Sequence, residues 1–336
     1  MRKRLLNGTT LILIGLMIAL GILIVLNFTR LSIEFQTGSA YSASNPPLYR
    51  YMAILDGSDE SFVEDIIIGM DRASEDYSVV YELWSFTGIS KEEAILRQLD
   101  IGIESKVDGI LIQAFSDERF ADLLVKAKRN NVPIITIGED VPSQEKVSFV
   151  SYNKYQMGSR VGSLLNPMLA KAGRDKGTIA IIQNSPLFDQ DQAFAIQEEL
   201  EEGFIVTPIT VNSVSERILN AEGLAKAIID EYDDLVAFIC LDGEETLGVV
   251  TALKDANMMD DVIIIGSDDD EEILDFISRG VIEATIVADI ENIGYEGIFD
   301  LTKFNKGQFV TQYRDIGVKI VDKDNLPLYL EEEGGE

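Results

Sequence analysis

Short apolar runs rich in β-branched residues alternate with amphipathic segments over most of the chain, from residue 49 to residue 321. The run 49–56, YRYMAILD, is followed by the segment 61–77, whose apolar residues recur at helical spacing: Phe62, Ile66, Ile67, Met70 and Ala73. A strand, an amphipathic helix and a further strand join as parallel strands through right-handed crossovers. The alternation therefore predicts an α/β fold with doubly wound parallel sheets.

The alternation falls into two consecutive series. The first predicts strands at 49–56, 78–86, 107–115 and 132–138 with helices at 61–77, 90–106 and 117–131. The second predicts helices at 152–172, 190–202, 216–232, 243–257, 270–280 and 290–304, strands at 177–185, 204–211, 235–242, 261–268 and 284–289, and a β-rich end at 313–321. Ser90 and Glu93 have the spacing of a capping box. We therefore expect two lobes of similar size.

The chain opens with three basic residues within its first four, followed by an uncharged apolar stretch over 9–28. About 20 apolar residues cross a bilayer as a helix, and this stretch is longer than the apolar part of most cleaved signal peptides. Basic flanks stay cytoplasmic. We expect a cytoplasmic flank at 1–8, one uncleaved transmembrane anchor at 9–28, a polar linker at 29–48 and an extracytoplasmic remainder. A cleaved signal peptide is the alternative.

The composition argues against several classes of function. The net charge of −30, from 58 acidic and 28 basic residues, disfavours nucleic acid as a partner. The chain has no histidine, the commonest general base and zinc ligand. Its one cysteine, Cys240, lies in an apolar run, which favours a buried thiol over a nucleophile. No Gly-rich phosphate loop follows a strand. We expect no enzyme activity, no cofactor and no metal ion.

Four blocks, at 107–140, 147–165, 235–257 and 262–298, carry a family resemblance. In their order and spacing the chain resembles the periplasmic-binding-protein type I family, in particular its ribose- and sugar-binding branch. The similarity covers 49–322. The chain is also similar to membrane-anchored sugar-binding sensors that pair with histidine kinases. Repressors of the lactose-repressor type share the fold, but they begin with a DNA-binding helix-turn-helix where this chain has its apolar stretch.

The resemblance implies two Rossmann-like lobes joined by a three-strand hinge, with a ligand held in the cleft between them. The crossings should fall near 152–153, 289–290 and 311–314. The expected division is a first lobe of 49–152 plus 289–312, a second lobe of 153–288 plus 313–330, and an acidic tail of 331–336.

The resemblance also implies which residues bind the ligand. Aromatic rings pack on the C–H faces of a sugar, and acids or amides bind its hydroxyl groups. Phe62 and Trp84 could equally be core residues, and Asp242 and Asp268 could instead cap the helices that follow them. The candidates are Asp59, Glu60, Phe62, Trp84, Gln113 and Glu139 in the first lobe and Asp191, Gln192, Asp242 and Asp268 in the second.

Five consecutive acids, 268–272, follow the apolar run VIIIGS. A metal site would require adjacent residues to converge, which a strand-to-helix turn does not readily allow. We expect Asp268 to face the cleft and the other four acids to occupy the first turn of the next helix, where the helix dipole favours negative charge.

The chain departs from the sugar-binding pattern at several positions. Gly138, Glu139 and Asp140 stand where an Asp-Arg pair is common, Asp191 and Gln192 stand where an Arg is common, and Ala288 stands where Gln is frequent. Such a pocket would hold carboxylates without an evident cation, which is costly when buried. The explanations left open are an amine-bearing or unusual ligand, a wetter pocket, and a domain that no longer binds the usual sugar.

These observations predict a solute-binding protein for a small polar ligand, most of all a sugar. Its partner would be an ABC-type permease in uptake or a membrane histidine kinase in signalling. One alternative is a sensor or scaffold lobe pair with an empty cleft. Another is a glycoside hydrolase with paired carboxylates about 5–10 Å apart, for which Asp242 and Asp268 are the nearest candidates. No sequence motif marks either acid as catalytic.

Overall fold

The computed structural model describes residues 36–38, 47–183, 190–210 and 217–333. The basic flank and the expected anchor at 9–28 lie outside these residues. In the part of the chain that is described, no helix is both long enough and apolar enough to span a bilayer.

The first lobe is built on a seven-stranded sheet with the order β1-β3-β2-β4-β5-β6-β12. The strands from β2 to β6 and β12 pair in parallel, whereas β1 runs antiparallel to β3 at one edge. Their bounds are β1 Gln36–Gly38, β2 Arg50–Asp56, β3 Val80–Phe86, β4 Gly109–Gln113, β5 Ile134–Ile137, β6 Ser148–Ser151 and β12 Tyr313–Asp315.

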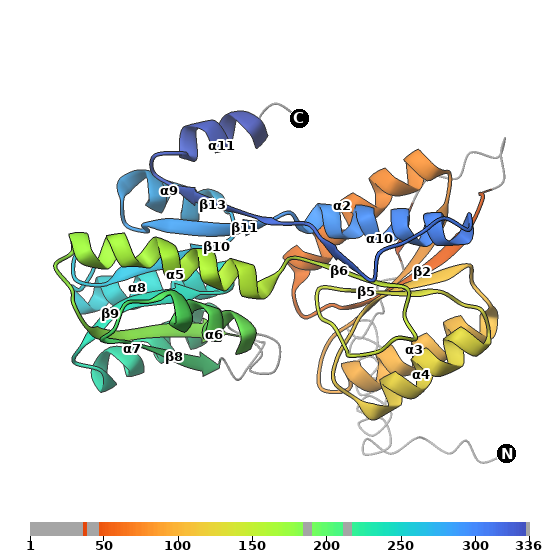
Figure 1. Ribbon diagram of the computed structural model, residues 1–336, viewed down its shortest axis with the longest axis horizontal. Coiled ribbons are helices and arrows are strands. Elements are labelled where there is room, and N and C mark those ends of the chain that lie inside the picture. The colour runs from red at the N-terminus through yellow and green to blue at the C-terminus, as the bar shows by residue number, and fades with distance from the viewer. Residues whose placement is uncertain (1–35, 39–46, 184–189, 211–216, 334–336) are drawn as a thin grey trace, which may run out of the picture.

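Two helices cover each face of this sheet (Figure 1). On one face lie α2 (Glu60–Tyr77) and α10 (Ile290–Asn305), which pack closely against each other. On the other face lie α3 (Lys91–Ser105) and α4 (Glu118–Arg129). Because both faces are covered, the central strand β2 carries five consecutive buried residues, and its continuous apolar sequence follows from that position.

The second lobe has a six-stranded sheet with the order β13-β11-β10-β9-β7-β8. All its pairs are parallel except β11 with β13. The strands are β7 Gly177–Gln183, β8 Phe204–Thr210, β9 Leu235–Cys240, β10 Ile263–Ser267, β11 Ala284–Ala288 and β13 Val318–Asp322. The helices are α5 Lys154–Lys171, α6 Gln190–Glu199, α7 Arg217–Glu231, α8 Gly243–Ala256, α9 Glu271–Arg279 and α11 Leu326–Glu333.

The two lobes lie side by side and the chain passes between them at three places (Figure 1). The first passage follows β6 and the second follows β11. The third was expected near 311–314, which is too early, because β12 still pairs with β6 in the first sheet. The passage therefore follows Asp315, and 313–315 belong to the first sheet instead of the second lobe.

Two further expectations are corrected and one is confirmed. The segment 29–48 is not linker throughout, because 36–38 form β1 at the edge of the first sheet. Ser90 stands at the N-cap of α3 without a side-chain hydrogen bond, so the capping box is not formed. Glu93 instead forms an ion pair with Arg119 of α4. Cys240 is fully buried, as expected, and burial raises the pKa of its thiol.

Candidate ligand site at the strand ends

The loop after β2 carries three of the candidate residues. Asp59 is the N-cap of α2 and accepts a hydrogen bond from the backbone N–H of Phe62. Glu60 is exposed in the first turn of that helix. The half-buried Phe62 ring lies against Gly138, where a Cβ would come within 3.2 Å of the ring. Phe62 thus contacts both the core and the loop after β5. It can therefore be a core residue and still lie beside the ligand.

The ends of β3 and β4 carry the other aromatic and amide candidates. Trp84 is half-buried and stacks on Phe86 with ring centroids 6.4 Å apart, on the face covered by α3 and α4. Gln113 is half-buried, and its side-chain oxygen accepts a hydrogen bond from the backbone N–H of Asp56. Gln113 therefore joins the ends of two adjacent strands, β4 and β2.

Asp242 and Asp268 lie together at the carboxyl ends of β9 and β10. Asp242 is the N-cap of α8 and accepts from the backbone N–H of Glu244 at 2.9 Å. Asp268 does not cap the helix that follows it. Its carboxylate accepts from the backbone N–H of Gly243 at 2.8 Å and so helps to cap α8. Both acids thus bind the same helix N-terminus.

The remaining acids of 268–272 divide differently from the expectation. Glu271 and Glu272 occupy the first turn of α9, as expected. Asp270 is the N-cap of α9, and no side-chain capping hydrogen bond is present there. Asp269 lies outside the helix and accepts a hydrogen bond from the hydroxyl of Tyr329 in α11. The C-terminal helix is therefore bonded to the turn that carries Asp268.

The first turn of α6 carries Asp191, which is exposed, and Gln192, which is buried. The backbone of Gln192 packs against Gly158 of α5, where a Cβ would lie 2.4 Å from the Gln192 carbonyl oxygen. Gln192 is thus held at a close contact between two helices of the second lobe.

Lysines accompany several acids that seemed uncompensated from the sequence. Glu139 pairs with Lys154 at 3.1 Å, and ion pairs also join Asp140 to Lys146 and Asp56 to Lys91. The expectation of carboxylates without a cation is therefore wrong for this part of the first lobe. The signal available in the sequence was Lys154 itself, which directly follows the expected first crossing.

Acids of the two lobes lie close enough to influence each other. Loss of hydration, aided by Asp242 and by Asp59 across the lobes, raises the pKa of Asp268 to about 7, although its side chain keeps contact with water. Loss of hydration, aided by Glu291 and by Asp269 of the second lobe, raises the pKa of Asp65 to about 6. Sequence reasoning missed Asp65, whose only signal was its position three residues after Phe62 on α2.

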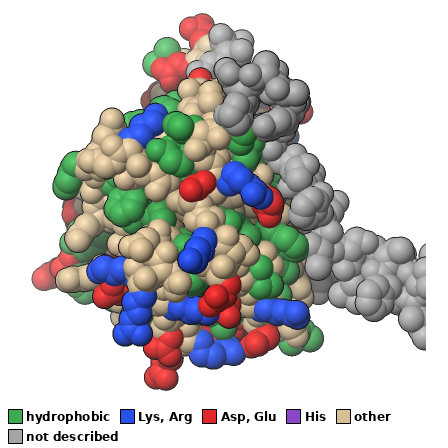
Figure 2. Space-filling model, turned by 90° about the vertical axis from the view of Figure 1, so that its right-hand side faces the viewer, with side chains coloured by type: hydrophobic (Ala, Val, Ile, Leu, Met, Phe, Trp, Pro, Cys, Tyr) green, Lys and Arg blue, Asp and Glu red, His purple; other side chains and the backbone are tan. Residues whose placement is uncertain are grey.

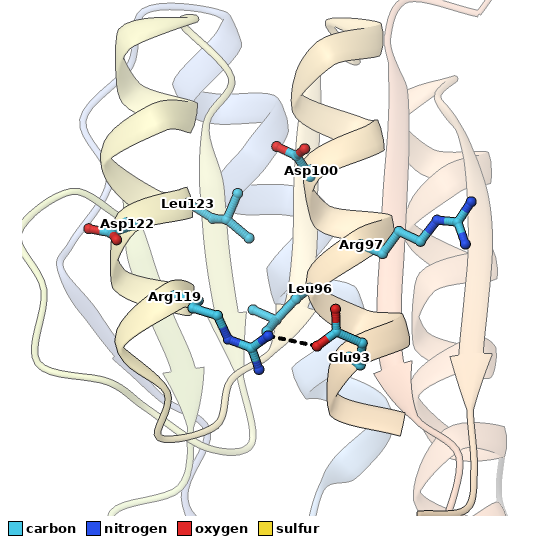
Figure 3. Close-up of a pocket in the computed structure, with 7 residues that line it drawn as sticks. All are labelled: Glu93, Leu96, Arg97, Asp100, Arg119, Asp122 and Leu123. Atoms are coloured by element: carbon cyan, nitrogen blue, oxygen red, sulfur yellow. Dashed lines mark hydrogen bonds and ion pairs between the residues drawn. The ribbon is translucent and has the colours of Figure 1, made fainter. Parts of the chain in front are cut away.

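Two surface hollows lie on the first lobe. One of about 330 Å³ lies between α3 and α4, where Arg119 points across to Glu93 (Figure 3). One of about 200 Å³ lies beside the loop after β5, around Lys146 and Gln312.

Figure 2 shows basic and acidic side chains interspersed over the part of the first lobe where α3 and α4 lie. Among the described residues no group of acids or cysteines could hold a metal ion.

Comparison with known proteins agrees with this architecture. The model of the periplasmic binding protein domain matches residues 51–308. The ribose import binding protein RbsB of Haemophilus influenzae is 22% identical over 221 residues, which is 64% of this chain and 72% of that protein.

Two solved structures have the same fold. A carbohydrate transporter solute-binding protein of Agrobacterium radiobacter, in complex with D-arabinose, has a TM-score of 0.74 and 21% identity and covers 87% of this chain and 99% of that one. The structure of the XylFII–LytSN complex has a TM-score of 0.70 and 22% identity, and the match covers 83% of this chain and 99% of that one. Since the family model matches well over half of the chain, from residue 51 to residue 308, and reaches into both lobes, the chain belongs to the periplasmic binding protein family.

Proposed function

We propose that this chain is an extracytoplasmic solute-binding protein, anchored by residues 9–28, that captures a small polar ligand between its lobes. A sugar is the first candidate, because RbsB is a ribose import binding protein and the Agrobacterium protein is bound to D-arabinose. The observation that carries the proposal is that Asp242 and Asp268 lie together at the carboxyl ends of β9 and β10, the edge of a parallel sheet where ligands bind.

The proposed contacts divide by chemistry. Phe62 and Trp84 would pack against the apolar faces of the ligand, and Asp242 and Asp268 would accept hydrogen bonds from its hydroxyl or amine groups. A carboxylate has about four lone-pair sites on its two oxygens, so each second-lobe acid has the capacity to accept from a ligand donor as well as from the backbone N–H of α8. Asp59, Glu60, Gln113, Asp191 and Gln192 complete the proposed set.

A thermal-shift screen of the purified protein against pentoses, hexoses, inositols, amino sugars and polyamines tests this function. A ligand at one hundred times its dissociation constant should add about 2.7 kcal/mol to the free energy of unfolding. Asp242→Asn and Asp268→Asn should abolish the shift, because Asn can still accept the backbone hydrogen bonds but carries no charge.

The matched control is Asp234→Asn. Asp234 lies at the opposite end of β9 from Asp242 and accepts a hydrogen bond from Thr178. This variant should retain the full ligand shift. A panel without any hit would contradict sugar capture and favour a lobe pair that binds no small solute. Turnover of a sugar by the purified protein would instead favour a glycosidase.

We further propose signalling over uptake as the output of binding. The resemblance to anchored sugar-binding sensors implies a membrane histidine kinase, and XylFII is a relative by fold that is found in a complex with a second protein. Co-purification of the full-length chain with a sensor kinase from its own membranes would support signalling. Co-purification with an ABC-type permease would support uptake instead.

A further inference from the structure

An ion pair joins the two lobes beside the first crossing. Glu139 follows β5 of the first sheet, and Lys154 is the first residue of α5, which packs against the second sheet. The Glu139 Oε1 to Lys154 Nζ distance is 3.1 Å, and the two side chains are 24% and 17% exposed. The lobes are thus linked by a side-chain contact in addition to the main chain.

Both partners are fixed to their own lobes. The Gly138 carbonyl accepts a hydrogen bond from the Ser151 hydroxyl at 3.0 Å, and the Gly138 N–H donates to Val150. On the other side, the Asn153 side chain caps α5 by accepting from the Gln156 N–H. A change in the angle between the lobes therefore changes the distance between Glu139 and Lys154, because neither backbone moves independently of its lobe.

Asp315 braces the hinge next to this ion pair. Its Oδ1 accepts from the Asn153 N–H at 3.2 Å and from the Gly317 N–H at 3.0 Å. The Ile316 N–H donates to the Ser151 carbonyl at 3.1 Å, so the first and third crossings are bonded to each other. The first and third crossings are therefore held together by hydrogen bonds. The Glu139–Lys154 ion pair lies beside them and connects the two lobes that rotate about this hinge.

The Glu139–Lys154 pair is mostly buried, and this burial reduces its screening by water. An ion pair exposed to water is screened and adds little, whereas a mostly buried pair is screened less and leaves an uncompensated charge when one partner is removed. The Arg119–Glu93 pair, with side chains 58% and 70% exposed, illustrates the first case. Glu139–Lys154, with its mostly buried side chains, is the less screened of the two pairs.

We propose that the Glu139–Lys154 ion pair is a latch that holds the angle between the lobes. This inference goes beyond the proposed function, because it requires no assumption about the ligand. It assigns Glu139 to the hinge in place of a ligand contact. Lys154 then acts as a positioning residue, because the angle between the lobes sets how the strand-end groups of one lobe lie relative to those of the other.

The test measures the distance between the lobes in the full-length protein without ligand. Ala121 of α4 and Ala227 of α7 are exposed helical positions on opposite lobes, and Cys240 is fully buried. Spin labels on Ala121→Cys and Ala227→Cys therefore report the angle by pulsed electron resonance. Lys154→Met and Glu139→Gln should each broaden the distance distribution about twofold, as the alternative angles become populated.

The charge swap Glu139→Lys with Lys154→Glu should restore the narrow distribution. The matched control is Lys91→Met, which removes an ion pair formed within the first lobe, with Asp56, and should leave the distribution unchanged. Unchanged distributions in both single variants would overturn the latch, and so would a swap that fails to restore the width. A ligand affinity that falls in Glu139→Gln without any change in distance would assign Glu139 to ligand contact. None of these readouts depends on whether the ligand is a sugar.

Discussion

Asp268 combines a strained backbone with a perturbed carboxylate. Its φ is 70°, in the left-handed region that Asn and Asp tolerate better than other non-glycine residues. Loss of hydration first, and the neighbouring Asp242 next, raise its pKa from 3.8 to about 7. The native state therefore binds a proton at this site between pH 3.8 and about 7, where the unfolded chain does not.

The first prediction concerns pH and stability. The pKa of Asp268 is raised on folding. Its contribution to the free energy of unfolding is therefore fully present below pH 3.8 and is lost as the pH rises to about 7. Asp65, whose pKa is raised to about 6, acts with the same sign. Asp268→Asn keeps the left-handed backbone and should flatten the decline in stability, as measured by urea unfolding at several pH values from about 5 to 8. An unchanged slope would show that the acid is ionised in the native state.

A second prediction at this scale concerns Arg314 in β12. Its guanidinium pairs with Asp300, which is fully buried in α10, and with Glu296. Arg314→Met should destabilise the fold by about 3–5 kcal/mol, because it leaves a buried charge without its partner. Adding Asp300→Asn should recover part of that loss, and urea unfolding of the single and double variants measures both. A double variant that recovers none of the loss would mean that the lost packing of Arg314 on Phe299, and not the unpaired charge, causes the destabilisation.

The position of Asp242 beside Asp268 was easier to predict from the sequence than the neighbours of the first-lobe candidates. Asp242 and Asp268 directly follow buried strands, and parallel strands bring such positions to one edge. Asp65 and Lys154 escaped notice because their neighbours come from other parts of the chain: Asp269 lies beyond the hinge, and Glu139 lies on the other lobe. Proximity of that kind depends on tertiary packing, which spacing along one element does not report.

At the scale of elements, α2 and α10 owe their close crossing to glycine. A Cβ at Gly69 would lie 1.7 Å from the Glu291 carbonyl oxygen, and one at Gly294 would lie 2.2 Å from that of Ile66. Each clash is with a backbone atom, which cannot rotate away. The two helices, one from each end of the first-lobe sequence, can therefore pack only while both positions lack side chains.

The third prediction compares two helical glycines. Gly294→Ala should destabilise the protein by about 1–3 kcal/mol, because the helices must separate. Gly223→Ala in α7 is the matched control, since its Cβ would have open space, and better helix propensity should make this variant up to about 1 kcal/mol more stable. Thermal unfolding distinguishes them. Equal midpoints in the two variants would mean that α2 and α10 can part without cost.

Most helices and strands were predictable because their burial is continuous or periodic. The run at β9 is buried throughout, and α4 has an apolar face and a capping Asp117. Short or edge elements were not predicted: β6 has four residues, β1 has three, and α11 lies in an acidic end of the chain. Such elements form because a neighbouring strand or helix is already in place, and their own sequences carry little pattern.

At the scale of the whole molecule, acidic side chains from the two lobes lie near one another. The chain has a net charge of −30. Asp59, Asp65 and Glu291 of the first lobe lie near Asp268 and Asp269 of the second, as the mutual effects on pKa show. Like charges across the gap oppose closure at neutral pH. A bound ligand therefore has to overcome this repulsion, and a ligand with a positive group would do so most directly.

The last prediction follows from the electrostatic repulsion between the acids of the two lobes. Lowering the pH from about 8 to 5 should protonate Asp268 first and Asp65 next, and the mean distance between labels at Ala121→Cys and Ala227→Cys should shorten. Raising the salt concentration at pH 8 should shorten it as well, because the Debye length falls from about 30 Å at 0.01 M to about 3 Å at 1 M. In Asp65→Asn with Asp268→Asn, the lobes should already be closer at pH 8, and the response to pH should be lost. If the double variant still responds in full, the net charge of the whole chain drives the movement, and these two acids do not.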